Sequence, residues 1–559
     1  MTNHHSIDVL LGIDSASALH KKPKERMALI YDAPDSKEAV RSLSTVEFYD
    51  LYHDVGPSDG AILLEYASPE QVQTCLDLDI WRGDEMSDEA MQSWTEQLLA
   101  VPNEQFAELW NDLDPEIMAL YLHRNIHLYV AEDKNDEVEI PEEQSANVAQ
   151  TPDFCYWVAY PEDADKAENL RQLVERLYAV FGVEKAWSTL EGMNWEMATD
   201  LEETAYRFRT ERIRELGFVP REEAAMLFSR VDVQKESAAI RTNTQAELYV
   251  EPYPTGEKLN ASLAVLEQYD SESLYFLKIL SKVTNIESIK IQLLSMAQQV
   301  SIYDGFQPHE TDGFEASMLL AVSYVNLGLE YASEHQDEVA ERILSHIALR
   351  RLFSLGWSVT MELNRKAKLL VVRGHLSIIE DQKMSLLTNE QRDCVEGMLC
   401  SRPRPRYSAL TPFMKLEDIR MAASVIADIA TRELFFGEGL HKTRDDISRL
   451  AYSNDIVIGV ENVSFDNIAI TYMCRKAMKC EEAWGVLSLE EMPSRDFLID
   501  SVSFERMRGL FCSDLPDMSV AAIRRYSSQL QDWIRETWPE EAKKPDPKFL
   551  VCLLVLEDE

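Results

Sequence analysis

Residues 44–64 read STVEFYDLYHDVGPSDGAILL, and residues 102–122 read PNEQFAELWNDLDPEIMALYL. When the two stretches are aligned, apolar side chains recur in both at positions i, i+3, i+4 and i+7, the spacing of one helix face. The matched residues are Phe48, Leu51, Tyr52 and Val55 in the first stretch and Phe106, Leu109, Trp110 and Leu113 in the second. Each stretch then reaches a dipeptide ending in proline, a residue that fits the first turn of a new helix. We therefore predict matching helices over 44–56 and 103–114.

Other helix starts between residues 25 and 130 carry similar signals. Ser44 with Glu47, and Ser68 with Gln71, have the spacing of capping boxes, in which each side chain binds a free backbone N–H group. Short helices broken at prolines are stable when neighbours bury each other's apolar stripes. The sequence thus predicts a mostly α, multi-domain helical-repeat or superhelical architecture with minor β elements.

Changes in composition suggest the domain limits. An acidic and polar stretch is typical of a solvated connection, and the β-prone runs IHLYV and FCYWVAY on its two sides are expected to pair as a hairpin. A helix is expected from Thr199 to Gly217, because Thr199 and Glu202 form a capping pair and a glycine ends the pattern. The final KFLVCLLVLEDE fits either a strand or a buried helical tail. The predicted domains are a helical repeat domain (1–130), an acidic linker (131–152), a central helical domain with a tetratricopeptide-like hairpin (153–387) and a C-terminal helical domain (388–559).

The charge balance limits the classes of partner. Asp and Glu total 98 against 55 Lys and Arg, so the formal net charge is −43. Nucleic-acid binding depends on cations that neutralise phosphates, and anionic membrane surfaces repel an acidic chain. We expect neither nucleic acid nor membrane as a partner. The eight cysteines include no CxxC pair, the first residues lack the features of a signal peptide, and no apolar run is long enough to span a bilayer, so a cytoplasmic location is expected.

Several stretches resemble a bacterial family classified only as a domain of unknown function. They are YASPEQVQTCLDLDIW (66–81), AYRFRTERIRELGF (205–218), YVNLGLEYAS and RRLFSLGWS (within 324–358), and RPRPRYSAL with the helix that follows it (402–435). The resemblance spans nearly the whole chain. It implies no activity, substrate or catalytic residue.

Two partial resemblances concern architecture. The repeated helices at 44–122 are similar to the helical repeats in the cytosolic N-terminal domain of bacterial magnesium transporters, in pattern only and without an implied magnesium site. The segment from Tyr324 resembles one tetratricopeptide unit. No second copy lies 34 residues to either side, so the unit fits an ordinary helical hairpin as well as it fits a peptide-binding array.

The sequence lacks the common motifs of catalytic and nucleotide-binding sites. The chain contains no phosphate-binding GxxxxGK[ST] loop, no GxGxxG, no HExxH and no GxSxG. His309-Glu310 is followed by TDGF, which cannot complete a zinc helix motif. The group His335, Glu338, Glu341 and His346 fits an exposed hairpin better than a metal site. We therefore expect no cofactor and no metal. The expected function is that of a non-catalytic cytoplasmic scaffold or regulatory protein that binds a protein partner through its repeat surfaces. The alternative is an enzyme of unknown class with an interdomain cleft site.

Five arginines are candidate contacts for a partner or an anion. Arg209 and Arg212 lie on or beside the apolar face of the helix at 199–217, where they either pack with their guanidinium groups reaching water or an acid, or await an anionic ligand. Arg402, Arg404 and Arg406 lie in the proline-rich SRPRPRYSALTP, which should be extended rather than helical. That stretch is either a stiff linker resting on acidic neighbours or a docking element for carboxylates or phosphates.

Overall fold

The computed structural model describes residues 23–130, 138–195, 198–243, 245, 247, 274–452, 456–511, 516–538, 546 and 550–556. In these ranges the chain is mainly helical with two small antiparallel sheets, which confirms the predicted fold class. The chain divides into two compact units. Unit 1 comprises residues 1–229, 243–322 and 341–353, and unit 2 comprises residues 230–242, 323–340 and 354–559. The domain limits proposed from composition stay predictions.

Unit 1 begins with a run of short helices and continues with longer ones. The first helices are α3 (Pro23–Tyr31), α4 (Ser36–Arg41), α5 (Thr45–Val55), α6 (Pro57–Tyr66), α7 (Pro69–Asp79), α8 (Asp88–Ala100), α9 (Asn103–Asp112) and α10 (Pro115–Asn125). They are followed by α11 (Ala164–Phe181), α12 (Val183–Trp195), α13 (Ala198–Glu215), α14 (Arg221–Ala225), the short helix η2 (Met226–Phe228), α17 (Tyr275–Leu280) and α18 (Ile286–Asp304). Helices α19 (Thr311–Ser333), α20 (Asp337–His346) and α21 (Leu349–Arg373) contain residues of both units.

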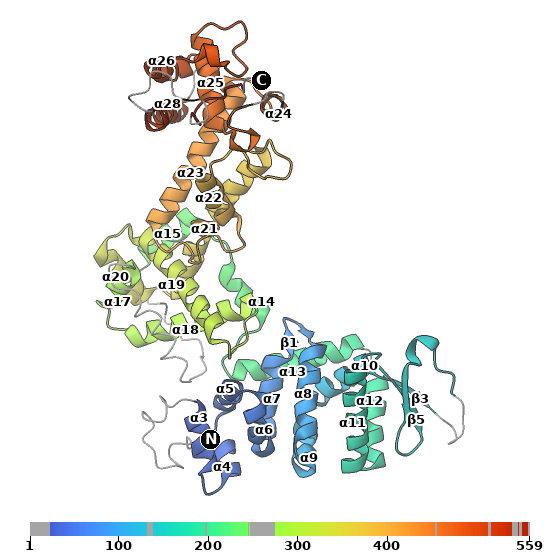
Figure 1. Cartoon of the computed structure of the whole chain (residues 1–559). Helices are drawn as coiled ribbons and strands as arrows, with labels where there is room; N and C mark the ends of the chain where they lie inside the picture. The colour runs from blue at the N-terminus through green and yellow to red at the C-terminus, as the bar shows by residue number, and fades with distance from the viewer. Residues whose placement is uncertain are drawn as a thin grey trace. The chain divides into compact units, whose positions relative to one another are not determined.

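The repeated sequence forms the expected helices. The stretches 44–56 and 103–114 fold as α5 and α9, and Phe48 and Phe106 are fully buried in the core of unit 1. Both capping boxes are present, at the starts of α5 and α7. Prolines begin α6 and α10 as predicted. In Figure 1 the helices of this region stand side by side, with the sheet that contains β3 and β5 at one end of the row.

The β-prone runs pair with each other, as the sequence predicted. Strand β3 (His127–Val130) is antiparallel to β5 (Tyr156–Tyr160). A third strand, β4 (Asn147–Gln150), lies on the other side of β5, so part of the stretch expected to be linker belongs to the sheet; the short helix η1 (Glu142–Gln144) precedes it. Residues 131–137 of that stretch lie outside the described residues. A two-residue ladder joins β1 (Trp81–Arg82) to β2 (Glu85–Met86).

The end of α13 follows the prediction, and its start does not. Gly217 adopts a left-handed conformation with φ 86°, and the N–H of Phe218 donates to the carbonyl of Ile213, as in a glycine-terminated helix. Thr199 was expected to cap the helix, but α13 already includes Ala198. Thr199 is therefore inside the first turn, and the predicted cap is wrong because the helix begins earlier than its capping pattern indicates.

Unit 2 is built from helices of varied length. They are α15 (Val233–Thr242), α22 (Asn389–Leu399), α23 (Leu416–Leu434), the π-helix η3 (Phe435–Gly439), α24 (Arg444–Tyr452), η4 (Val460–Asn462), α25 (Phe465–Ala477), η5 (Leu489–Glu491), α26 (Arg495–Ser501), α27 (Phe504–Arg508) and α28 (Asp517–Thr537). The described part of the tail is neither the strand nor the helix that the sequence allowed. It has a turn at Val551 and Cys552 and pairs through single bridges, Ile456 with Leu556 and Leu487 with Val555.

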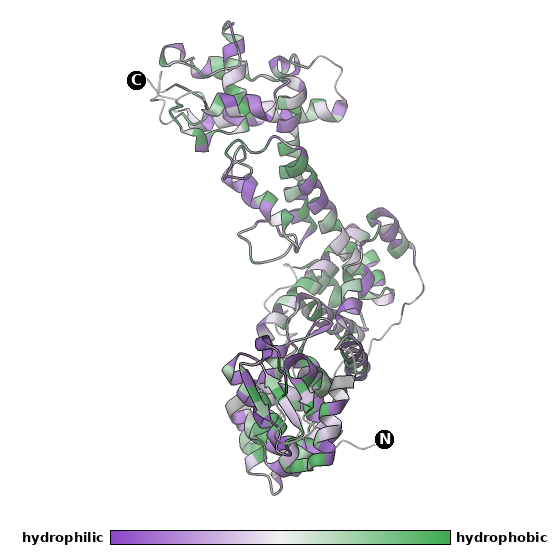
Figure 2. Ribbon diagram, turned by 90° about the vertical axis from the view of Figure 1, so that its right-hand side faces the viewer, coloured by the Kyte–Doolittle hydropathy of each residue, from purple (hydrophilic) through white to green (hydrophobic). Residues whose placement is uncertain are grey.

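Hydrophobic and hydrophilic residues alternate along most helices, as Figure 2 shows. This pattern is typical of amphipathic helices that pack on one face and meet water on the other. Among the described residues, no helix combines the length and the apolar character that crossing a membrane requires.

Candidate functional site

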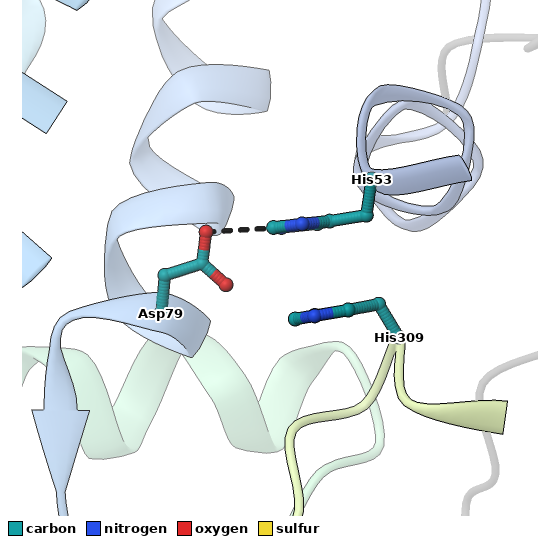
Figure 3. Close-up of side chains that lie close together, drawn as sticks. All are labelled: His53, Asp79 and His309. Carbon is teal, nitrogen blue, oxygen red and sulfur yellow. Dashed lines mark hydrogen bonds and ion pairs between the residues drawn. The ribbon is translucent and has the colours of Figure 1, made fainter. Parts of the chain in front are cut away.

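A cluster of polar aromatic and acidic side chains lies inside unit 1. Tyr49 and His53 are one turn apart on α5 and therefore project from the same side of that helix. Asp79 is the last residue of α7, and Trp94 comes from α8. His309 lies between α18 and α19, far away in the sequence. Figure 3 shows the rings of His53 and His309 side by side, both directed toward the Asp79 carboxylate.

The Asp79 carboxylate has hydrogen-bond partners from two helices, α5 and α8. The Tyr49 hydroxyl donates to Oδ1 at 3.0 Å, and the Trp94 indole N–H donates to Oδ2 at 3.0 Å. His53 Nε2 lies 3.0 Å from the same Oδ2. The side chain of Asp79 is only 10% exposed, so these contacts replace water almost entirely. A carboxylate held this way keeps a fixed orientation.

The two imidazoles are stacked almost in parallel. Their centroids are 3.8 Å apart, and the angle between the ring planes is 4°. One ligand atom from each of His53, Asp79 and His309 lies within 4.8 Å of the other two. Within the described ranges, these are the His, Cys, Asp or Glu side chains that bring three ligand atoms within 4.8 Å of one another. We call this group the His-Asp-His site.

Tyr49 determines how His309 presents its ring. Burial, and then the neighbouring charge of Asp79, raise the pKa of the Tyr49 phenol well above its ordinary value, so the hydroxyl keeps its proton. Because that proton is donated to Asp79, the phenol oxygen can only accept at its 2.9 Å contact with His309 Nδ1. Nδ1 then carries the hydrogen, and Nε2 of His309 has the lone pair. A partner on one ring nitrogen commonly prepares the other nitrogen to bind a metal.

The position of Asp79 favours a cation. The C-terminal end of a helix carries a partial negative charge, and a carboxylate there adds a full one. Arg82 donates from Nη1 to the carbonyl oxygens of Asp79 and Trp81. A cation bound by the carboxylate would therefore relieve repulsion at the end of α7. The buried thiol of Cys75, on the same helix, is a poor competing ligand, because burial raises its pKa well above the ordinary value and keeps it protonated.

The His-Asp-His site opens into a cavity of about 220 Å³. His53, Asp79 and His309 line it together with Tyr52, Arg82, Trp94, Gln97 and Gln307. Two imidazoles and one carboxylate are three protein ligands, the number found in catalytic zinc sites and in the facial triad of non-haem iron enzymes. Such sites leave coordination positions for water or substrate, and here the cavity provides the room.

Of the two arginines singled out on α13, Arg212 is engaged by acids. It donates to both carboxylate oxygens of Asp77, from Nε at 2.7 Å and from Nη2 at 2.8 Å, and to Asp114 from Nη1 at 2.8 Å. Burial acts to lower the pKa of Arg212, but Asp77 and Asp114 raise it overall. Since Asp77 is on α7 and Asp114 caps α10, Arg212 connects three helices.

Arg209 has different surroundings. Its Nε donates to the backbone carbonyl of Asp77 at 2.7 Å, and its guanidinium lies 5.5 Å from the ring centre of Trp81 and 5.7 Å from that of Tyr206. Burial lowers its pKa. It lines a second cavity, next to the His-Asp-His site.

The three arginines of the proline-rich stretch lie in unit 2. Arg402 rests over the Trp357 ring at 5.4 Å, Arg404 donates from Nη1 to the carbonyl of Ala409 at 3.0 Å, and Arg406 is exposed. The stretch is not helical, as predicted, but it is not extended throughout, because it turns at Tyr407 and Ser408. Its backbone approaches α22 closely, since the glycine at position 397 leaves room for it. Neither the Arg209–Arg212 pair nor these three residues contribute to the His-Asp-His site.

Sequence reasoning missed all three residues of the His-Asp-His site as a group. His309 was considered only for a local zinc motif, and the repeat comparison did not address the polar residues within α5. Two signals were present: a tyrosine and a histidine spaced i, i+4 on α5, and two aspartates within the otherwise apolar CLDLDIW. Buried carboxylates need partners. The partner at position 309 is supplied by tertiary structure alone.

Comparison with known proteins identifies the family. The model of the family described as "Family of unknown function (DUF6178)" matches residues 15–556, and the chain belongs to this family. No curated protein and no solved structure matches the chain.

Proposed function

We propose that this member of the DUF6178 family binds a divalent transition-metal ion at the His-Asp-His site. The observation that supports the proposal is the convergence of two stacked imidazoles and one buried carboxylate from α5, α7 and the loop after α18. Imidazole suits zinc, iron, nickel and copper, and a carboxylate with two imidazoles suits the first two especially. The three candidate ligand atoms lie within 4.8 Å of one another, and the contact of His53 Nε2 with Asp79 Oδ2 is 3.0 Å.

The ion has a chemical use because it faces a cavity. A metal with open positions lowers the pKa of a bound water or polarises a bound oxygen atom. Trp94 and Tyr49 hold the carboxylate ligand, as the outer partners of metal ligands do. The proposal therefore favours the enzyme alternative, with a small-molecule substrate that reaches the ion through the cavity.

Equilibrium dialysis of metal-free protein against Zn²⁺ tests the proposal. We expect the wild type to bind one ion per chain, and His309→Ala and Asp79→Asn to lose that ion. His127→Ala is the matched control, because His127 is exposed on β3 and lies outside the site. Circular dichroism of each variant verifies its fold. Zn²⁺ binding that is equal in all four proteins, or absent from the wild type, would refute the proposal and leave the cluster as a structural hydrogen-bond network.

A second proposal keeps the protein partner expected from the helical repeats. An open groove of about 980 Å³ runs along the first turns of α7 and α10. Its charged lining is mainly acidic, with Glu70, Asp112, Glu116 and Glu215, so it suits a basic segment. Affinity capture from cytoplasm tests it: the variant Glu70→Gln/Glu215→Gln should lose a partner that the control Glu89→Gln/Glu104→Gln retains. The cytoplasm is the proposed location. The seven cysteines within the described ranges form no disulfide, which suits a reducing compartment.

A further inference from the structure

A second cavity, of about 180 Å³, lies in unit 1 beside the His-Asp-His site. Three arginines line it, Arg82, Arg209 and Arg221, and no acidic residue does. We call it the arginine-lined cavity. In a chain whose net charge is −43, a cavity with positive charge alone is unusual. Such a lining attracts an anion.

Within the described ranges Arg209 forms no direct ion pair, although the charges of Asp77 and Glu222 act on it from a distance. Only its Nε donates a hydrogen bond, to a backbone carbonyl, and among the described residues its two terminal amino groups have no acceptor. The nearest acids are already engaged: Asp77 accepts two hydrogen bonds from Arg212, and Glu222 accepts one from the Tyr206 hydroxyl at 2.8 Å. A guanidinium that lies near two adjacent aromatic rings and has unused donors is prepared for a carboxylate or phosphate.

Arg221 approaches the same cavity from its rim. It is exposed, and its Nε donates to the carbonyl of Tyr303 at 3.4 Å. Position 83, in the turn between β1 and β2, is a glycine, and a Cβ added there would lie 3.4 Å from Nη1 of Arg221. The arginine side chain therefore lies against this turn. Two arginines, one from α13 and one from α14, therefore line one cavity.

Most of the remaining lining is apolar, and Gln307 is an uncharged polar side chain in it. Leu78, Trp81, Ile213, Phe218 and Ile302 provide most of it. A cavity of roughly 150 Å³ lined by apolar side chains holds a benzene molecule, so this one has room for a body of about that size. The lining thus suits a molecule with one anionic end and one apolar part.

The arginine-lined cavity and the cavity of the His-Asp-His site are neighbours. Arg82 and Gln307 line both. We infer that the arginine-lined cavity binds an anionic small molecule with an apolar body, a carboxylate or a phosphate ester, and presents it to the ion of the His-Asp-His site. Presentation to the ion rests on the proposed function, whereas binding of the anion stands without it.

Isothermal titration calorimetry on the full chain, freed of metal, tests the binding. The probes are benzoate, phenyl phosphate and the uncharged benzamide. We expect benzoate or phenyl phosphate to bind at least about tenfold more tightly than benzamide, because each charge-assisted hydrogen bond contributes about that factor. The tighter of the two anions identifies the head group. Equal affinity for benzamide, or no binding of either anion, would overturn the inference.

Variants locate the binding. Arg221→Gln and Arg209→Gln should each weaken anion binding by about tenfold. Arg221 is exposed, so its variant keeps the inference testable even if Arg209→Gln folds poorly. Arg207→Gln is the matched control, since Arg207 is exposed, lies on α13 like Arg209, and is outside the cavity. Equal affinity in the Arg221 and Arg207 variants would place the anion elsewhere and refute the inference.

His309→Ala separates this inference from the proposed function. That variant should lose Zn²⁺ and keep the anion affinity of the metal-free wild type. If Zn²⁺ binds to the wild type and neither anion does, the proposed function stands and this inference fails. If the anions bind in an arginine-dependent way and Zn²⁺ does not, the cavity is an anion site and presentation to an ion is refuted.

Discussion

Replacing Arg212 with methionine should destabilise unit 1. Methionine keeps an apolar stem of similar length but removes the guanidinium that Asp77 and Asp114 share. The side chains of these aspartates are 1% and 4% exposed, so water cannot take over the role of the guanidinium. Gln73 still donates to Asp77 at 3.0 Å, but a neutral amide does not balance two buried charges.

The size of the loss follows from burial. Breaking a buried ion pair by removing one partner costs about 3–5 kcal/mol. Arg212 is 32% exposed, so about two thirds of that cost applies, and we expect the free energy of unfolding to fall by about 2–3 kcal/mol at pH 7. Replacing Asp77 with asparagine in the same chain removes one of the uncompensated charges and should recover part of the loss.

The loss should also depend on pH. Burial raises the pKa of the Asp77 carboxyl, and Arg212 opposes that shift, so the methionine variant raises this pKa further. An acid whose pKa is higher in the folded than in the unfolded state binds protons on folding, and its destabilising effect shrinks as the pH falls through the folded-state pKa. The gap between variant and wild type should therefore be smaller at mildly acidic pH than at pH 7.

Urea unfolding followed by tryptophan fluorescence measures both effects. Arg207→Met is the control, since Arg207 lies on the same helix and is exposed, and its loss should stay within about 0.5 kcal/mol. If the Arg212 variant lost no more than this control, or if its deficit were the same at both pH values, the ionic connection between α7, α10 and α13 would not stabilise the fold.

Three further predictions concern other parts of the chain. Phe106→Ala should cost about 3–5 kcal/mol in urea unfolding, because the ring is 1% exposed in the core; a loss under about 1 kcal/mol would mean that this helix face is exposed in solution. Tyr49→Phe should weaken Zn²⁺ binding at least about tenfold in dialysis, whereas Tyr52→Phe, whose hydroxyl has no hydrogen-bond partner among the described residues, should leave it unchanged. Replacing Arg402, Arg404 and Arg406 with glutamine separates the two interpretations of the proline-rich stretch. A docking element predicts lower partner capture from cytoplasm with an almost unchanged melting temperature, and a stiff linker predicts a lower melting temperature with intact capture.

The repeat region was predictable because its signals are local. Helix α5 needs only its own apolar spacing and the pair Ser44 and Glu47 to be recognised, and both features lie within a few turns. The pairing of β3 with β5 was predictable for a related reason, since two β-prone runs flank one polar stretch. The start of α13 was not predictable, because the capping pattern of Thr199 and Glu202 lies inside the first turn of the helix rather than at its boundary.

The candidate site was not predictable, because its parts lie far apart in the sequence. Tyr49 and His309 are 260 positions apart and nonetheless share a hydrogen bond. A lone histidine in a loop has many possible roles, and only the packing of unit 1 selects one of them. The same holds for the two arginines of α13: the helical wheel places both near the apolar face, but the partners that separate Arg212 from Arg209 lie on other helices.

X-ray absorption spectroscopy of the zinc-loaded chain tests the central proposal most directly. We predict a first shell of nitrogen and oxygen only, at about 2.0–2.2 Å, with the outer-shell scattering of two imidazoles. His309→Ala should show one imidazole fewer or bind no ion, and His127→Ala should match the wild type. A sulfur ligand at about 2.3 Å, or an imidazole signal that survives the loss of His309, would place the ion elsewhere and contradict the assignment of the His-Asp-His site.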